Sequence, residues 1–142
     1  MADFQQFYPF VEALAEKQHN LQSDTLRILL TNTQPQAANA VKADIAEIAA
    51  GNGYAAGGPQ ATVSSSAQTA GTYKLVIADT VISASGGPVG PFRWAVLYNA
   101  TSGGLIGFWD YSTPTTLLDG STITVDFSES NGVLTLKLIP AV

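Results

Sequence analysis

The chain has 142 residues, of which six are basic and eleven acidic, so its net charge is −5 and charged residues make up 12% of the total. This share is about half of the ~25% usual for a soluble domain. The absence of cysteine excludes disulfides, cysteine-bound zinc and thiol catalysis. The basic residues are spread singly, which argues against nucleic acid as a partner. The sequence contains no run of 18 apolar residues, so it predicts no membrane-spanning helix.

The length fits a single domain, residues 1–142, that buries enough surface for one core. With so few charges, the exterior must consist largely of Ala, Gly, Ser, Thr, Gln and Asn. Such a surface packs against a partner at low cost, because desolvating an unpaired charge costs several kcal/mol. Composition therefore favours assembly over chemistry. The N-terminus has no basic residue ahead of its apolar run, so we expect a protein made in the cytoplasm and not exported.

Residues 1–18 allow two interpretations. Apolar residues at three- and four-residue spacing predict a helix from Asp3 to Lys17 with one apolar stripe, formed by Phe4, Phe7, Tyr8, Val11, Leu14 and Ala15. Pro9 instead suits the first turn of a helix, so the helix can begin near Tyr8 and leave residues 1–7 as an extended arm that docks through its phenylalanines. The sequence alone does not choose between them.

Residues 22–142 read as a β-rich domain with one more helix. TLRILLT (Thr25 to Thr31) predicts a strand, and Val41, Ile45 and Ile48 mark one face of a second helix near 38–50. Beyond Tyr54, short apolar runs alternate with Gly, Pro and Asn. These runs predict strands at 61–65, 72–78, 80–84, 92–99, 105–111, 122–127 and 133–139.

Turn signals and alternation indicate antiparallel connections. Ile123, Val125 and Phe127 face one way, and the pairs Asp119-Gly120 and Asn131-Gly132 accept the positive φ of a tight turn. The predicted fold class is mainly β: an antiparallel β-sandwich or compact β-barrel of about seven to nine strands with an N-terminal helix and a second short helix.

The densest aromatic block, residues 86–111, predicts a hairpin. By alternation, Phe92, Trp94, Val96 and Tyr98 share one face of its first strand. Buried aromatics are the dominant anchors of cores and interfaces, so core or subunit interface is the leading interpretation of this face. A sugar-stacking platform that uses Trp94 and Trp109 is the alternative.

No motif in the chain carries chemistry. There is no nucleotide-binding glycine loop and no nucleophile elbow, His19 is the only histidine, and the spacing of Asp110, Asp119 and Asp126 matches no compact calcium loop. We therefore predict a protein that is not an enzyme, with no catalytic residue, no cofactor and no metal site.

Several segments together resemble small virion-associated proteins of tailed bacteriophages, from His19 to about Leu138. The segments that carry the resemblance are HNLQSDTLRILLTNTQPQ, VKADIAEIAAGNGYAAGG, SASGGPVGPFRWAVLYNAT and LIGFWDYSTPTTLLDGSTITVDF. The resemblance implies a non-enzymatic structural protein, best interpreted as a capsid decoration (cement) protein. It implies no catalytic residue.

The resemblance implies the major capsid protein and further copies of the chain, in a homo-oligomer such as a trimer, as partners. It places the protein on the capsid surface in the virion and in the host cytoplasm during assembly; nucleic acid and membrane are not expected partners. The candidate interface residues are Phe4, Phe7, Tyr8, Phe92, Arg93, Trp94, Tyr98, Trp109 and Tyr111. A phage tail or connector component is the first alternative, and a carbohydrate-binding β-sandwich module the second.

Overall fold

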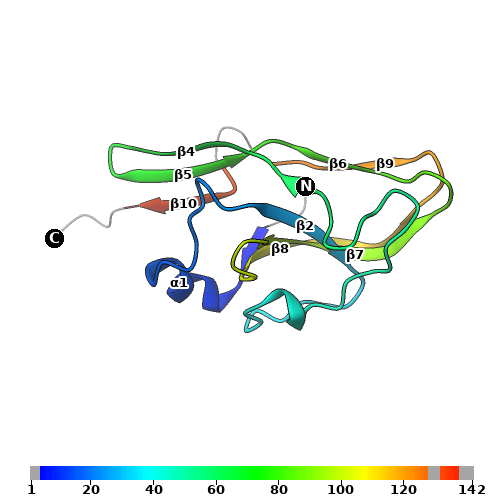
Figure 1. Ribbon diagram of the computed structural model, residues 1–142, viewed down its shortest axis with the longest axis horizontal. Coiled ribbons are helices and arrows are strands. Elements are labelled where there is room, and N and C mark those ends of the chain that lie inside the picture. The colour runs from blue at the N-terminus through cyan, green and yellow to red at the C-terminus, as the bar shows by residue number, and fades with distance from the viewer. Residues whose placement is uncertain (1–3, 128–131, 138–142) are drawn as a thin grey trace.

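The computed structural model of the chain describes residues 4–127 and 132–137 (Figure 1). These residues form a mainly β structure with one α-helix, α1 (Tyr8–Ala15), and a 3₁₀ turn at Lys42–Asp44. The strands are β1 (Phe4–Gln6), β2 (Leu26–Thr31), β3 (Gln60–Ala61), β4 (Val63–Thr69), β5 (Thr72–Ile77), β6 (Thr80–Ser83), β7 (Val89–Asn99), β8 (Leu105–Leu117), β9 (Thr122–Val125) and β10 (Leu134–Lys137).

All strand pairs are antiparallel, as the turn signals predicted. The largest sheet has the order β1-β8-β7-β2-β3, and two smaller sheets have the orders β10-β5-β4 and β6-β9. In Figure 1 the two smaller sheets lie along one side of the large one, so the strands form two layers. The described strands do not close into a barrel, which removes that alternative of the predicted fold class.

Most predicted strands overlap a strand of the structure, because alternation and turn residues act together. The predicted strand 61–65 is an exception, since it spans the end of β3 and the start of β4. The run Thr25 to Thr31 contains β2, and the aromatic hairpin of residues 86–111 is β7 paired with β8. Val125 and Phe127 are both buried, as their alternation predicted. The pair Asp119-Gly120 makes a turn, but its flanking strands β8 and β9 belong to different sheets and do not form a hairpin. Asn131 and the last residues of the predicted strand 133–139 lie outside the described residues.

The N-terminal segment settles the first open alternative. The helix begins at Tyr8 with Pro9 in its first turn, so the helix predicted from Asp3 to Lys17 is wrong. Phe4–Gln6 is extended, but it is not a free arm, because it pairs with β8 in the register Phe4 to Trp109. Asp3 lies outside the described residues.

The predicted helix at 38–50 is also wrong. Only Lys42–Asp44 is helical, as a single 3₁₀ turn, because the segment's backbone groups bond to neighbouring elements instead. The Ile48 amide donates to the Leu30 carbonyl at 3.0 Å, and the Lys42 amide donates to the Gly103 carbonyl at 2.9 Å. The apolar spacing is helical, yet hydrogen bonds to β2 and to the β7–β8 turn hold the chain in another path.

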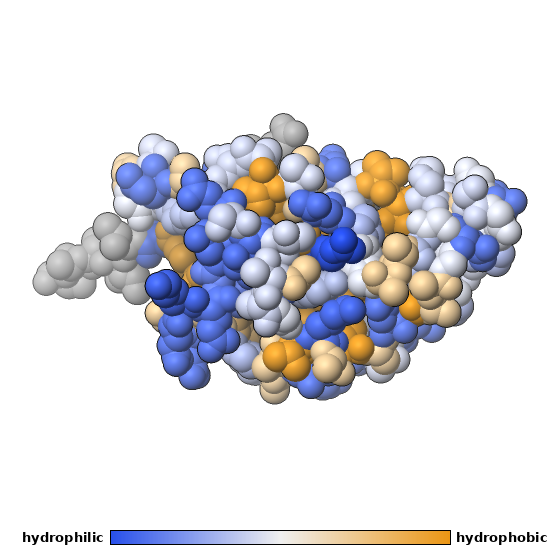
Figure 2. All heavy atoms as spheres, viewed as in Figure 1, coloured by the Kyte–Doolittle hydropathy of each residue, from blue (hydrophilic) through white to orange (hydrophobic). Residues whose placement is uncertain are grey.

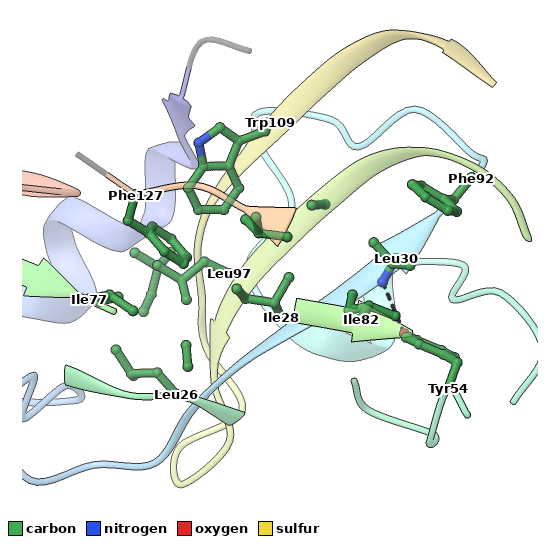
Figure 3. Packing of buried hydrophobic residues seen from close by; sticks show 14 of the residues in the cluster. Leu26, Ile28, Leu30, Tyr54, Ile77, Ile82, Phe92, Leu97, Trp109 and Phe127 are labelled. Carbon is green, nitrogen blue, oxygen red and sulfur yellow. Dashed lines mark hydrogen bonds between the residues drawn. The ribbon is translucent and has the colours of Figure 1, made fainter. Parts of the chain in front are cut away.

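Buried side chains fill both faces of the large sheet. The main cluster lies between the two layers and contains Leu26, Ile28 and Leu30 of β2 with Leu97, Trp109 and Phe127 (Figure 3). A second cluster on the opposite face contains Phe7, Leu29, Trp94, Val96, Tyr98, Leu105 and Phe108.

The expectation that Phe92 shares a face with Trp94 is wrong. A register shift between these residues turns Phe92 into the main cluster.

Tyr54 ties the irregular segment 47–58 to β2. Its hydroxyl donates to Glu47 Oε1 at 2.7 Å and accepts the Leu30 amide at 3.0 Å (Figure 3). Glu47 Oε1 also accepts the Gly57 amide at 2.6 Å. Burial is the main cause that raises the pKa of Tyr54 far above its usual range, so the hydroxyl keeps its proton and both hydrogen bonds.

Candidate functional site

The structure places most of the predicted interface residues inside the chain's own core. Five of the nine are buried, namely Phe7, Phe92, Trp94, Tyr98 and Trp109, and three are half-buried, namely Phe4, Arg93 and Tyr111. Tyr8 alone is exposed, at 73%. The aromatic face of the hairpin is therefore core, which is one of the two outcomes that its leading interpretation allowed.

Arg93 forms an ion pair within the hairpin. Its Nε and Nη2 donate to the two carboxylate oxygens of Asp110 at 2.8 and 3.0 Å, and its guanidinium lies 4.7 Å from the centre of the Trp94 ring. The Arg93 hydrogen bonds are the main cause that lowers the pKa of Asp110, and the Ser112 amide adds to it. Ser112 has φ +72°, where β8 carries extra residues opposite β7. The pair therefore braces this irregular part of the hairpin.

One exposed apolar surface gathers around α1. Tyr8 and Val11 lie on the outer side of the helix, with 73% and 65% of their surface exposed, while Phe10 points into the core. The loop beside the helix adds Val41, which is 45% exposed, and the Tyr8 amide donates to the Ala37 carbonyl of this loop at 2.8 Å. We call Tyr8, Val11 and Val41 the α1 face.

A shallow hollow separates α1 from this loop. Its volume is about 210 Å³, and its lining includes Pro9, Ala13, Ala40 and Val41. Glu12 is the one charged residue among the described residues of this lining. Of the α1 face, Val41 lines this hollow, and a protruding side chain of a partner can occupy it.

Sequence reasoning named Tyr8 but missed the two valines. A helix from Asp3 to Lys17 puts Val11 in one apolar stripe with Phe4 and Phe7, and the helix predicted at 38–50 contains Val41. The signal for Val11 is Pro9, which sets the start of the helix at Tyr8 and so separates Val11 from the extended residues Phe4 to Gln6. The sequence holds no comparable signal for Val41.

Elsewhere on the molecule, apolar residues are scattered. Figure 2 shows a face on which near-neutral, pale residues separate small orange patches. Among residues 4–127 and 132–137, the exposed large apolar residues away from α1 are Val81, Leu118 and Leu136.

A hollow of about 580 Å³ lies between the end of α1 and the sheet β10-β5-β4. Its apolar lining includes Leu14, Leu21, Tyr73 and Leu136. This volume is within the range of small-molecule sites. Its polar side includes His19 and Asp24, whose arrangement decides what chemistry the hollow can support.

Asn99 joins His19 and Asp24 in one hydrogen-bond network. The Asn99 amide nitrogen donates to His19 Nδ1 at 3.1 Å and to Asp24 Oδ2 at 2.7 Å. The Asn99 amide oxygen accepts the Thr101 and Ser102 amides at 2.9 and 3.1 Å. Because Nδ1 must accept, the neutral ring carries its proton on Nε2, which is buried and has no hydrogen-bond partner within the described part of the chain. The network fixes the β7–β8 turn and holds no activated nucleophile.

We expect acid to weaken the fold through His19. Burial is the main cause that lowers its pKa below 6.5, and the Asp24 charge opposes this shift. Below pH 6.5 the unfolded chain therefore binds a proton that the folded chain excludes, so the free energy of unfolding falls as the pH falls, by at most about 1.4 kcal/mol per pH unit.

Urea denaturation at pH 7.5 and 5.5 measures this loss, and His19→Gln should lose less stability than wild type over the same interval. An equal loss in both proteins would show that His19 does not cause it.

Among residues 4–127 and 132–137, no three His, Cys, Asp or Glu side chains lie close enough together to hold a metal ion. No helix in these residues is long and apolar enough to cross a membrane. Comparison of the chain with protein-family models, curated proteins and solved structures finds no match.

Proposed function

We propose that this chain is a non-enzymatic structural protein of a tailed-phage virion that binds the outer surface of the capsid, where it contacts the major capsid protein. The observation that carries the proposal is an exterior poor in charge that presents the apolar α1 face. The resemblance of the segments between His19 and Leu138 to small virion proteins supports the same assignment.

The α1 face suits a contact with a large, preformed partner. Tyr8 and Val11 stand on a helix whose inner side is anchored by buried Phe10, so little conformational entropy is lost when the face is covered. Tyrosine is among the residues enriched at interface hot spots. A protein that binds the assembled shell and not the free subunits stabilises the shell by mass action.

The carbohydrate-binding alternative loses its platform in this structure. Trp94 and Trp109 are only 7% and 6% exposed, and they lie in clusters on opposite faces of the large sheet. A sugar that stacks on tryptophan requires an exposed ring, so these residues give no support to that alternative.

Co-sedimentation of the purified protein with isolated phage heads and, separately, with tails tests the proposal. We expect the wild type to pellet with heads and not with tails. Tyr8→Glu/Val11→Glu should weaken head binding at least about tenfold, since it removes two apolar side chains and adds charges that must be desolvated.

Leu118→Glu is the matched control, because Leu118 is 68% exposed in the turn after β8, outside the α1 face. Its binding to heads should equal that of wild type. Pelleting with tails alone favours the tail or connector alternative, and pelleting with neither rejects a virion role for the protein.

A further inference from the structure

Strand β4 forms an open edge of the sheet β10-β5-β4. It pairs with β5 on one side, and no described strand pairs with its other side. Five of its seven residues are exposed. Figure 1 shows β4 along the outer border of its layer. Another chain can therefore pair with the backbone N–H and C=O groups that point away from β5, which no strand of the described residues uses.

From Ser65 to Thr69, this edge lacks the devices that normally prevent such pairing. Natural edge strands are protected by charged residues, by proline or by bulges. The sequence VSSSAQT of β4 has no charge and no proline, and no charged residue occurs anywhere between Glu47 and Lys74. One irregularity lies between Val63 and Ser65, and the remaining residues, Ser65 to Thr69, pair with β5 in regular register.

We propose that β4 pairs antiparallel with β4 of a second copy of this chain, across a two-fold axis at Ala67. Ser65 of one copy then lies opposite Thr69 of the other, and Ser66 lies opposite Gln68. The two three-stranded sheets become one continuous sheet of six strands. This inference does not depend on the capsid proposal.

The uncharged sequence of β4 suits a second copy as the occupant of this edge. A two-fold axis sets each residue of β4 opposite a residue of the same strand, so a charged residue at the axis would face its own copy, which destabilises a strand pair. Neutral Ser, Ala, Gln and Thr avoid that repulsion, and their hydroxyl and amide groups can hydrogen-bond across the pair.

The nearest charge in the register does not oppose this pairing. Lys74 of β5 lies beside Ala67, so the two copies of Lys74 would be three strand spacings apart, or roughly 14 Å. That separation exceeds the ~8 Å screening length at physiological salt. Self-pairing uses the whole edge, so the contact closes at two copies.

Two lysine substitutions in the same cross-strand row test the proposal. Ala67 of β4 and Thr135 of β10 both lie opposite Lys74, on its two sides, so each substitution adds one charge next to the same lysine. Only Ala67 is on the proposed contact edge. Analytical ultracentrifugation over a concentration series should show a dimer for wild type and Thr135→Lys. Ala67→Lys should raise the dimer dissociation constant at least about tenfold.

A charge swap distinguishes loss of pairing from loss of folding. Ala67→Glu alone should also dimerise poorly, whereas an equimolar mixture of Ala67→Lys and Ala67→Glu should form a mixed dimer, and circular dichroism should show all variants folded.

A wild-type monomer at every concentration, or a dimer that Ala67→Lys leaves intact, would overturn the proposal. So would a mixture that stays monomeric. A monomer that still pellets with phage heads would overturn this inference alone and leave the proposed function standing.

Discussion

Gly58→Ala is expected to lower the free energy of unfolding by more than about 4 kcal/mol, a size confined to core and special backbone positions. Gly58 has φ +75°, and a Cβ added there would overlap the backbone carbonyl of Ile28 in β2. The clash is between two main chains, so rotating a side chain cannot relieve it. Either β2 or the loop that contains Gly58 must move to relieve the clash. Two hydrogen bonds oppose that movement: the Ile28 amide donates to the Pro59 carbonyl at 3.0 Å, and Arg27 Nη1 donates to the Gly58 carbonyl at 2.7 Å.

Gly120→Ala is the matched control. Gly120 has φ +84°, and nothing lies within 4 Å of the Cβ that alanine would add. Alanine at this position therefore lowers the free energy of unfolding only through its left-handed backbone conformation, by about 1–2 kcal/mol. Urea denaturation of both variants separates the two contributions. Equal losses of stability would mean that the close approach of Gly58 to β2 does not matter for folding.

The strands of this chain were easier to predict from the sequence than its helices, for a physical reason. A strand in this chain is marked twice, by alternation such as that of Ile123, Val125 and Phe127, and by the Gly, Pro or Asn residues that bound it. The helix predicted at 38–50 rested on apolar spacing and on Gly51 and Gly53 as a stop, with no signal for its first residue. Its backbone groups found partners on β2 and at Gly103, and those partners come from distant parts of the chain that a local pattern does not reveal.

The candidate site was predictable only in part, because aromatic residues suit a core and an interface equally. Trp94 and Phe92 were grouped by strict alternation, and the register shift that separates them depends on the extra residues of β8 around Ser112. Conversely, Asn99 gives no sequence signal for its role. Only the fold brings it to His19, 80 positions away in the chain.

The α1 face and the β4 edge are different kinds of surface. The α1 face offers apolar side chains and a hollow, which recognise a partner through shape and burial. The edge of β4 offers main-chain groups and small neutral side chains, which suit a partner that presents another strand. A dimer through β4 would carry two α1 faces on one rigid unit, so two weak contacts with a repeating surface would act together.

Trp109→Ala is expected to lower the free energy of unfolding by about 3–5 kcal/mol, the usual cost of removing a large buried aromatic ring. Trp109 is 6% exposed, and its ring centre lies 4.6 Å from that of Phe4 and 5.3 Å from that of Phe127. It thereby joins the edge strand β1 to the segment that follows β9, and alanine would leave a cavity between the two layers. Thermal unfolding should show a midpoint lower by about 10–15 °C.

Tyr8→Ala supplies the comparison, because it removes an aromatic ring that is 73% exposed and contacts little of the core. Its unfolding midpoint should stay within about 2 °C of wild type, as surface substitutions usually do. If the proposed function is right, the two variants also separate in binding: Tyr8→Ala folds normally and binds heads weakly, whereas Trp109→Ala binds normally at temperatures where it is folded. Loss of stability in Tyr8→Ala as large as in Trp109→Ala would place Tyr8 in the core and remove it from the α1 face.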